Sequence, residues 1–440
     1  MDAEPTTPGF HRVLGPRMLL LLVVGDILGA GIYLLLGDVV AEVGGLAWLA
    51  FALAFVLAGA AAASYAELVT RHPGAAGTAL YADKAFGREW LTFAVGAAVA
   101  LSAVSTAATT MRAFAGDYLR EFVDLPLVPV TVLLATLLGL VAVRGIELSA
   151  RVNVVMTLIE LGGLLVVIVI GGAAISQGDA DLDRLSSTSE GFGVGALVAG
   201  AALAFFAFLG FEDAVHVSEE VTDVRRTFPR VLLGAVLLTS VVYLAVTVVA
   251  VAVVPPDVLS GSGGPLLEVV RRGPGDVALR PFSAVALVAV ANTSLFAMVA
   301  ASRLLFGMAR AGQLPRGLGR LGSTGTPVAA TVTVAGVATV LTFTAATSAL
   351  AETAVVLLLA VLVIVNLAAA VLRRRAEQHG FLAPAWVAPV GAVATAAVLV
   401  HELVTASATE WLRLGALIGG IATLGVAARL ALATAPPITD

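Results

Sequence analysis

Three carboxylates stand inside long apolar stretches of the sequence. Asp26 interrupts the stretch Met18–Leu36, Glu160 lies within Ala150–Ile175, and Glu212 follows another apolar run. An ionised carboxylate at the centre of a bilayer costs roughly 2.5–3.5 kcal/mol or more, so such side chains face a cavity or a partner. Reversible proton binding is the chemistry that suits them, and Asp26 could also pair with an ammonium group. The structural alternative is a neutral carboxyl bonded to a neighbouring helix.

Two of these acids stand beside glycine in matching segments. Residues 25–33 have the sequence GDILGAGIY, and residues 205–213 have the sequence FFAFLGFED. Matching glycine interruptions in two halves of a membrane protein indicate a binding site between inverted repeats. The alternative is that the glycines only allow close helix packing.

A helix that breaks inside the membrane leaves peptide groups without partners, and these are tolerated only where they line a cavity. Free N–H groups at Gly29, Ala30 and Gly31 would attract a carboxylate, assisted by the positive end of the following half-helix. Free carbonyl groups at Ile27 and along Phe206 to Leu209 would attract an ammonium group. Together they suit a zwitterion such as an α-amino acid.

The composition requires a membrane environment for these segments. Of the 440 residues, 59% are hydrophobic and 12% are charged, against about 25% charged residues in a soluble domain. The mean hydropathy is +1.01. The chain has no basic stripe for nucleic acid and no Cys, and the five His residues are far apart. With neither a nucleophile–base pair nor a phosphate loop, we predict no enzyme activity, no cofactor and no metal site.

Apolar stretches of about 20 residues predict twelve membrane helices. Three examples are Trp90–Met111, Leu232–Val254 and Val328–Ala351. Most Lys and Arg residues fall on one side if both termini are cytoplasmic, so we expect a multi-pass protein of the inner (cell) membrane. Residues 1–440 form one domain in this scheme, with repeat one at about 17–175, repeat two at about 191–374 and two extra helices at about 385–433.

Four motifs in order resemble those of the amino acid–polyamine–organocation superfamily. GAGIY at 29–33 resembles the family's G-[ST]-G-I-F signature, and residues 205–229 resemble its helix 6 and following loop. Residues 302–315 are similar to the end of its helix 8, and residues 153–164 are similar to its helix 5. With the helix pattern, the resemblance extends over nearly the whole chain.

The resemblance implies an all-α, LeuT-like fold of five plus five inverted-repeat helices, with helices 1 and 6 broken, that works by alternating access. It implies that the backbone of Ala30 and Gly31 holds a substrate carboxylate. The amine would be held by the carbonyl groups of Ile27, Phe206 and Leu209. The whole expected substrate site comprises Ile27, Gly29, Ala30, Gly31, Phe206, Ala207, Leu209 and Gly210.

Asp26, Glu160 and Glu212 are the expected coupling and gating residues, and two of them depart from the family pattern. Asp26 stands where several members have a neutral residue. Glu160 stands where one branch has a lysine whose amine mimics a bound sodium, so the lysine mechanism cannot be transferred to this chain. Glu219 and Glu220, close in sequence to Arg225 and Arg226, belong either to an inner gate network or to a solvated helix end.

The sequence therefore predicts a permease in the bilayer that moves an amino acid together with protons. Two alternatives stay open. One is sodium-coupled or exchange transport of cationic amines or polyamines, and the other is an amino acid sensor of the same fold that does not transport.

Overall fold

The computed structural model describes residues 12–74, 76–273, 279–375 and 380–416, together with residues 419, 420 and 423. In these residues the regular secondary structure is helical, without a strand, and one isolated bridge joins Leu14 to Val221. The predicted all-α class is therefore confirmed for the described part of the chain.

The helices follow the apolar segments of the sequence. In chain order they are α1 Pro16–Leu28, α2 Ala30–Val43, α3 Ala47–Arg71, α4 Gly77–Phe86, α5 Glu89–Phe114, α6 Asp117–Arg120, α7 Leu127–Val143, α8 Ile146–Gln177, α9 Val194–Phe206, α10 Val224–Val253, α11 Pro256–Ser260, α12 Pro265–Arg271, α13 Leu279–Arg310, α14 Val328–Leu341, α15 Thr347–Arg375 and α16 Val387–Thr405. Short 3₁₀ segments lie at Gly44–Leu46, Leu182–Ser186, Asp213–Glu220 (η3) and Arg316–Gly319.

Seven helical runs among the described residues are long and apolar enough to cross a membrane. The first, Pro16–Arg71, contains α1, α2 and α3. The other six contain α5, α8, α10, α13, α15 and α16. The helices α7, α9 and α14 are apolar but shorter. The chain thus has the character of a multi-pass membrane protein. The count of twelve spans stays a prediction, because most of the twelfth, Trp411–Ala433, lies outside the described residues.

Some predicted helix ends were wrong. The expected helix Val328–Ala351 ends at Leu341, and α15 begins at Thr347. The expected helix Leu232–Val254 begins at Val224, a full two turns earlier. Apolar content marks the part of a helix that meets lipid, whereas the helix itself extends into the charged interface or stops at a Thr-rich turn.

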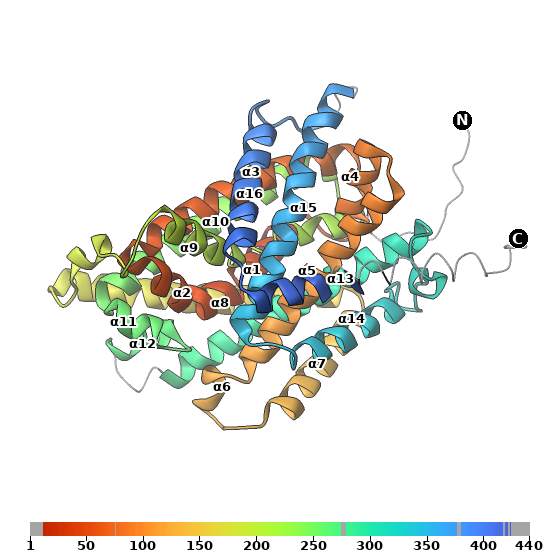
Figure 1. The fold of residues 1–440 in the computed structure, drawn as a ribbon. Helices are drawn as coiled ribbons and strands as arrows, with labels where there is room; N and C mark the ends of the chain where they lie inside the picture. The colour runs from red at the N-terminus through yellow and green to blue at the C-terminus, as the bar shows by residue number, and fades with distance from the viewer. Residues whose placement is uncertain are drawn as a thin grey trace, which may run out of the picture.

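The two interrupted segments lie inside the bundle. In Figure 1, α1 is in the middle of the molecule, where it packs against α8, α10 and α13, while α9 packs against α2 and α3. Further from this centre, α15 lies beside α16, and α14 lies beside α7. The short helix α11 covers α2. This arrangement surrounds both interruptions with long helices.

The residues before α1 are fixed to the end of η3. The backbone N–H groups of Val13 and Leu14 both donate to the carbonyl oxygen of Glu220, at 3.0 and 2.9 Å, and Thr222 N–H donates to Leu14 O at 3.0 Å. The Leu14 side chain is buried. Residues 13 and 14 therefore lie against the end of η3.

Candidate functional site

The first membrane segment is interrupted at Gly29. The helix α1 ends at Leu28 and α2 starts at Ala30, and Gly29 between them has φ −21° and ψ −136°. The Gly29 N–H donates a long hydrogen bond to Gly25 O, at 3.3 Å. The predicted break in helix 1 is present at the predicted glycine.

The second interruption is longer. The helix α9 ends at Phe206, turns follow through Glu212, and the 3₁₀ segment η3 begins at Asp213. Gly210 within the turns has φ +118°, a conformation that residues with a side chain rarely adopt. The glycine therefore permits the turn at this point, four residues after α9 has ended.

The two interruptions touch each other. A Cβ added to Gly31 would lie 2.3 Å from Ala207 Cα, and one added to Gly210 would lie 2.7 Å from Asp26 Oδ2. Only a residue without a side chain allows these approaches. The structure thus places the start of α2 against the end of α9, and the end of α1 against the turn that contains Gly210.

Side chains from other helices bind the peptide groups at the interruptions. Ala30 N–H donates to Thr293 Oγ1 of α13 at 2.9 Å. The Tyr243 hydroxyl of α10 lies within hydrogen-bonding distance of Ile27 O and of Ala207 O, the latter at 2.9 Å. A phenol has one proton to donate, so it can satisfy only one of these two carbonyl oxygens fully at a time.

The predicted site residues are brought together around this contact. Phe206, Ala207 and Leu209 are buried, as are Ile27 and Ala30. The carbonyl oxygen of Phe206 already accepts the Leu209 N–H at 3.1 Å.

The three acids occupy different surroundings, although all are buried. Glu212 Oε2 accepts the N–H of Gly210 at 3.0 Å. The Asp26 side chain packs against the same glycine, Gly210. Its Oδ2 atom has no hydrogen-bond partner among the described residues. Asp26 and Glu212 therefore flank one peptide unit of the second interruption.

Glu160 is further from that peptide and belongs to a polar network between α8 and α13. Its Oε1 accepts from Asn292 Nδ2 at 3.1 Å, and Asn292 Oδ1 accepts from Asn153 Nδ2 at 2.9 Å. Asn292 Nδ2 also lies 3.4 Å from Gly25 O in α1. The Tyr33 hydroxyl of α2 donates to the Glu160 carbonyl oxygen at 3.1 Å. This network ties both halves of the first segment to α8 and α13.

Sequence reasoning missed the residues that bind the interrupted backbone, namely Tyr243, Thr293 and Asn292. Each is a polar residue in an apolar helix, which is a signal, but membrane helices contain many such residues that serve only packing. It also left the role of Glu220 open. The structure pairs Glu220 with Arg303 rather than with Arg225 or Arg226.

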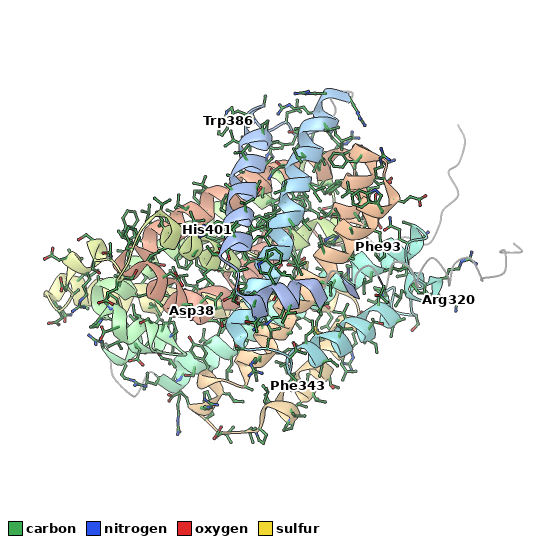
Figure 2. All side chains as sticks on the ribbon, in the orientation of Figure 1. Asp38, Phe93, Arg320, Phe343, Trp386 and His401 are labelled. Carbon is green, nitrogen blue, oxygen red and sulfur yellow. The ribbon has the colours of Figure 1, made fainter. Side chains whose placement is uncertain are left out.

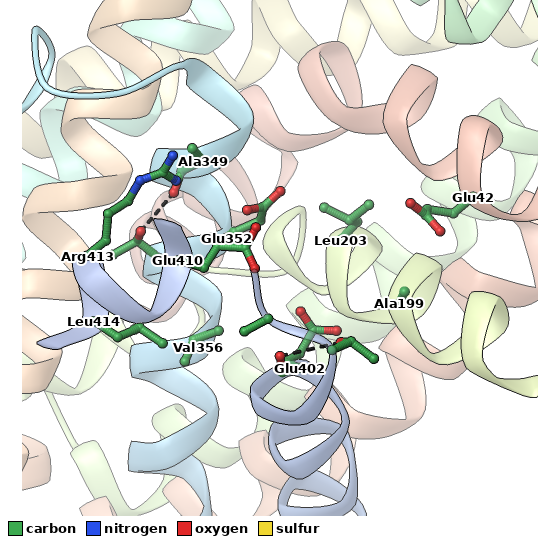
Figure 3. A pocket seen from close by; sticks show the side chains of 13 residues that line it. Glu42, Ala199, Leu203, Ala349, Glu352, Val356, Glu402, Glu410, Arg413 and Leu414 are labelled. Atoms are coloured by element: carbon green, nitrogen blue, oxygen red, sulfur yellow. Dashed lines mark hydrogen bonds between the residues drawn. The ribbon is translucent and has the colours of Figure 1, made fainter. Parts of the chain in front are cut away.

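A separate cavity of 150 Å³ lies between α2, α9, α15, α16 and the helical residues 408–416. Figure 3 shows the side chains of Glu42, Glu352, Glu402 and Glu410 around it, together with Arg413. Its lining contains none of the predicted site residues.

Comparison with known proteins gives one family and several relatives. A family model described as amino acid permease matches residues 14–422. The chain is 33% identical over 228 residues to the vacuolar cationic amino acid transporter 4 of Arabidopsis thaliana, which is 47% of this chain and 37% of that protein. It is 27% identical over 314 residues to the branched-chain amino acid permease BcaP of Lactococcus lactis subsp. cremoris, which is 67% of this chain and 68% of that protein.

A third relative is the methylthioribose transporter of Bacillus subtilis, 26% identical over 262 residues, which is 54% of each chain. The matched regions thus span well under two thirds of the plant and Bacillus proteins.

Proposed function

Because the chain belongs to the amino acid permease family, we propose that it is a secondary active transporter that carries an amino acid across the cell membrane by alternating access. The observation that carries the proposal is the contact between the two helix interruptions, where one Tyr243 hydroxyl is shared by Ile27 O and Ala207 O. Peptide groups with incomplete hydrogen bonding at membrane depth favour a small polar ligand.

The polarity of the interruptions supports a zwitterionic substrate. At the start of α2 the peptide N–H groups and the helix dipole favour a carboxylate. A substrate carboxylate bound there replaces Thr293 as the acceptor for Ala30 N–H, or accepts a hydrogen bond from the Thr293 hydroxyl. The carbonyl group that Tyr243 leaves unsatisfied, Ile27 or Ala207, then accepts from the substrate ammonium. Gly29, Gly31, Phe206, Leu209 and Gly210 complete the proposed site.

Protons are the proposed coupling ion. Asp26 and Glu212 both lie next to Gly210, so a proton gained by either acid changes the charge beside the second interruption. Glu160 takes a proton within the network that joins α8 and α13 to α1. In the proposed cycle, a proton enters with the substrate from outside, and both are released inside. The proposed topology has twelve membrane helices, with both termini in the cytoplasm.

A neutral amino acid with a small apolar side chain is the proposed substrate, because Ala30 and Ala207 at the site are themselves small and apolar. A cationic amine, moved by sodium coupling or exchange, is the second candidate. The Asp26 oxygen that has no partner among the described residues favours it.

Uptake by purified protein in liposomes tests these proposals. We expect radiolabelled alanine or leucine to accumulate when the lumen is alkaline, and not when only a sodium gradient is imposed. Uptake that ignores the pH gradient but requires sodium would reject proton coupling. Substrate binding without counterflow would reject transport and indicate a sensor.

A further inference from the structure

Basic side chains from three helices lie near the end of α3, and two of them pair with a buried carboxylate. Glu67 pairs with Arg71 of α3 (Nη2 to Oε1, 3.1 Å) and with Arg373 of α15 (Nη1 to Oε2, 3.7 Å). Arg375 of α15 donates to Ala85 O of α4 at 3.0 Å, next to the exposed Lys84. We call the four cations Arg71, Lys84, Arg373 and Arg375 the basic cluster. Among the described residues, Glu67 pairs with two of these four cations.

The guanidinium group of Arg71 is incompletely hydrogen bonded. Its side chain is only 5% exposed, and its Nε and Nη1 atoms have no hydrogen-bond partner within the described part of the chain. Leaving a buried charged donor without an acceptor is costly. An anion with several oxygen atoms is the ligand that would satisfy these donors, because a guanidinium matches phosphate in geometry and charge.

His72 at the end of α3 lies close to two of these cations. Its pKa is lowered by partial burial first, and then by the charges of Lys84 and Arg71. Both cations disfavour a further positive charge on the imidazole.

The basic cluster lies at a membrane interface, because three candidate spans begin or end there. The helices α3 and α15 end at Arg71 and Arg375, and α16 begins at Val387. Figure 1 shows the end of α15 and the start of α16 at the same end of the molecule, and Figure 2 labels Trp386 there. Tryptophan is enriched at the level of lipid headgroups.

The loop before α16 sets apolar side chains beside the cations. Phe381 N–H donates to Thr70 Oγ1 at 3.1 Å, and Ala383 N–H donates to Glu67 Oε2 at 3.2 Å. These bonds fix the loop to the end of α3. Within it, Leu382 is 40% exposed and Trp386 is 66% exposed. The basic cluster thus adjoins an exposed apolar surface.

We propose that the basic cluster binds the phosphate headgroup of an anionic phospholipid, whose acyl chains lie along Leu382 and Trp386. Basic pockets between membrane helices are suited to such headgroups. The adjoining apolar surface distinguishes a lipid from free phosphate, which would gain nothing from it. This site is separate from the helix interruptions, so it holds whether or not the chain transports amino acids.

Thermal unfolding of the purified full chain in neutral detergent tests the site. We expect phosphatidylglycerol to raise Tm, because a ligand that binds only the folded state stabilises it. The concentration that gives half of the maximal rise in Tm measures the affinity. Phosphatidylcholine and inorganic phosphate at equal concentration leave Tm unchanged. The variants Arg373→Gln and Arg375→Gln each raise the half-maximal phosphatidylglycerol concentration about fivefold, which corresponds to about 1 kcal/mol per basic residue.

Two further variants keep the test decisive. Arg320→Gln is the matched control, because Arg320 is an exposed arginine outside the basic cluster (Figure 2), and it leaves the lipid response as in the native chain. Glu67→Gln removes the carboxylate that pairs with Arg71 and Arg373, and lowers the half-maximal concentration, an effect that misfolding cannot imitate. Equal responses in all variants, or an equal response of the native chain to inorganic phosphate, would overturn the proposal.

Discussion

Arg303 and Glu220 form an ion pair in which both side chains are buried, with 2.7 Å between Nε and Oε1. The pair joins the end of η3 to α13. The carbonyl group of the same Glu220 accepts the N–H groups of Val13 and Leu14. One residue therefore holds α13 with its side chain and the segment before α1 with its backbone.

Replacing Arg303 by Gln should destabilise the protein strongly. The variant leaves the Glu220 carboxylate buried without its cation, which costs about 3–5 kcal/mol. We expect a clear fall in Tm in detergent. The double variant Glu220→Gln with Arg303→Gln removes both charges and should regain a large part of the loss. A double variant as unstable as the single one would show that shape, and not charge, matters at this pair.

Replacing Gly31 by Ala should impair transport. The new methyl group would overlap Ala207, and such overpacking costs about 1–3 kcal/mol while it separates the two interruptions. Gly162→Ala in α8 is the matched control, because an added Cβ there meets nothing within 4 Å. Initial uptake rates in liposomes compare the two variants. Equal rates would mean that the contact between α2 and α9 is not needed for transport.

Replacing Tyr243 by Phe should enlarge the effect of substrate on stability. Without the hydroxyl, Ile27 O and Ala207 O lose a hydrogen bond that contributes about 0.5–1.5 kcal/mol. A bound substrate ammonium group replaces that hydrogen bond, so substrate stabilises the variant more than the native protein. Tyr118→Phe is the control, since its hydroxyl donates to Tyr33 O, at 2.8 Å, four residues beyond the first interruption. We expect a larger substrate-induced rise in Tm for Tyr243→Phe alone. The same rise in both variants would place the ammonium elsewhere.

Replacing Asp26 by Asn and Glu212 by Gln, singly, should separate coupling from exchange. If protons drive transport, at least one variant loses accumulation driven by a pH gradient and keeps exchange of substrate across the liposome membrane. Glu147→Gln is the control, because its exposed carboxylate pairs with Arg151 on the same helix. Undiminished accumulation in both variants would exclude the two acids from coupling.

Local sequence signals were sufficient to locate the interruptions. Glycine beside a carboxylate inside an apolar run marked Gly29 and Gly210, and the chain leaves the helix at Gly29 and in the turns around Gly210. These features depend on a few adjacent residues, whose backbone preferences are intrinsic. The same signals do not give the helix ends, as the early end of α14 at Leu341 shows.

Hydrogen-bond and ion-pair partners on distant helices could not be predicted from the sequence. Thr293 is 263 positions from Ala30, and Tyr243 is 216 positions from Ile27. The partner of Glu220 was sought among nearby arginines, but it is Arg303, 83 positions away. Which polar side chain meets which depends on the packing of whole helices, and no local pattern records that packing.

The pairing of Leu14 with Thr222 has a consequence for biosynthesis. The two residues are 208 positions apart, so at roughly 5–20 residues per second the ribosome needs about 10–40 s to supply the second after the first. Throughout that interval Leu14 in the nascent chain lacks this partner, so the contact between the segment before α1 and the end of η3 forms only after about half of the polypeptide has been made.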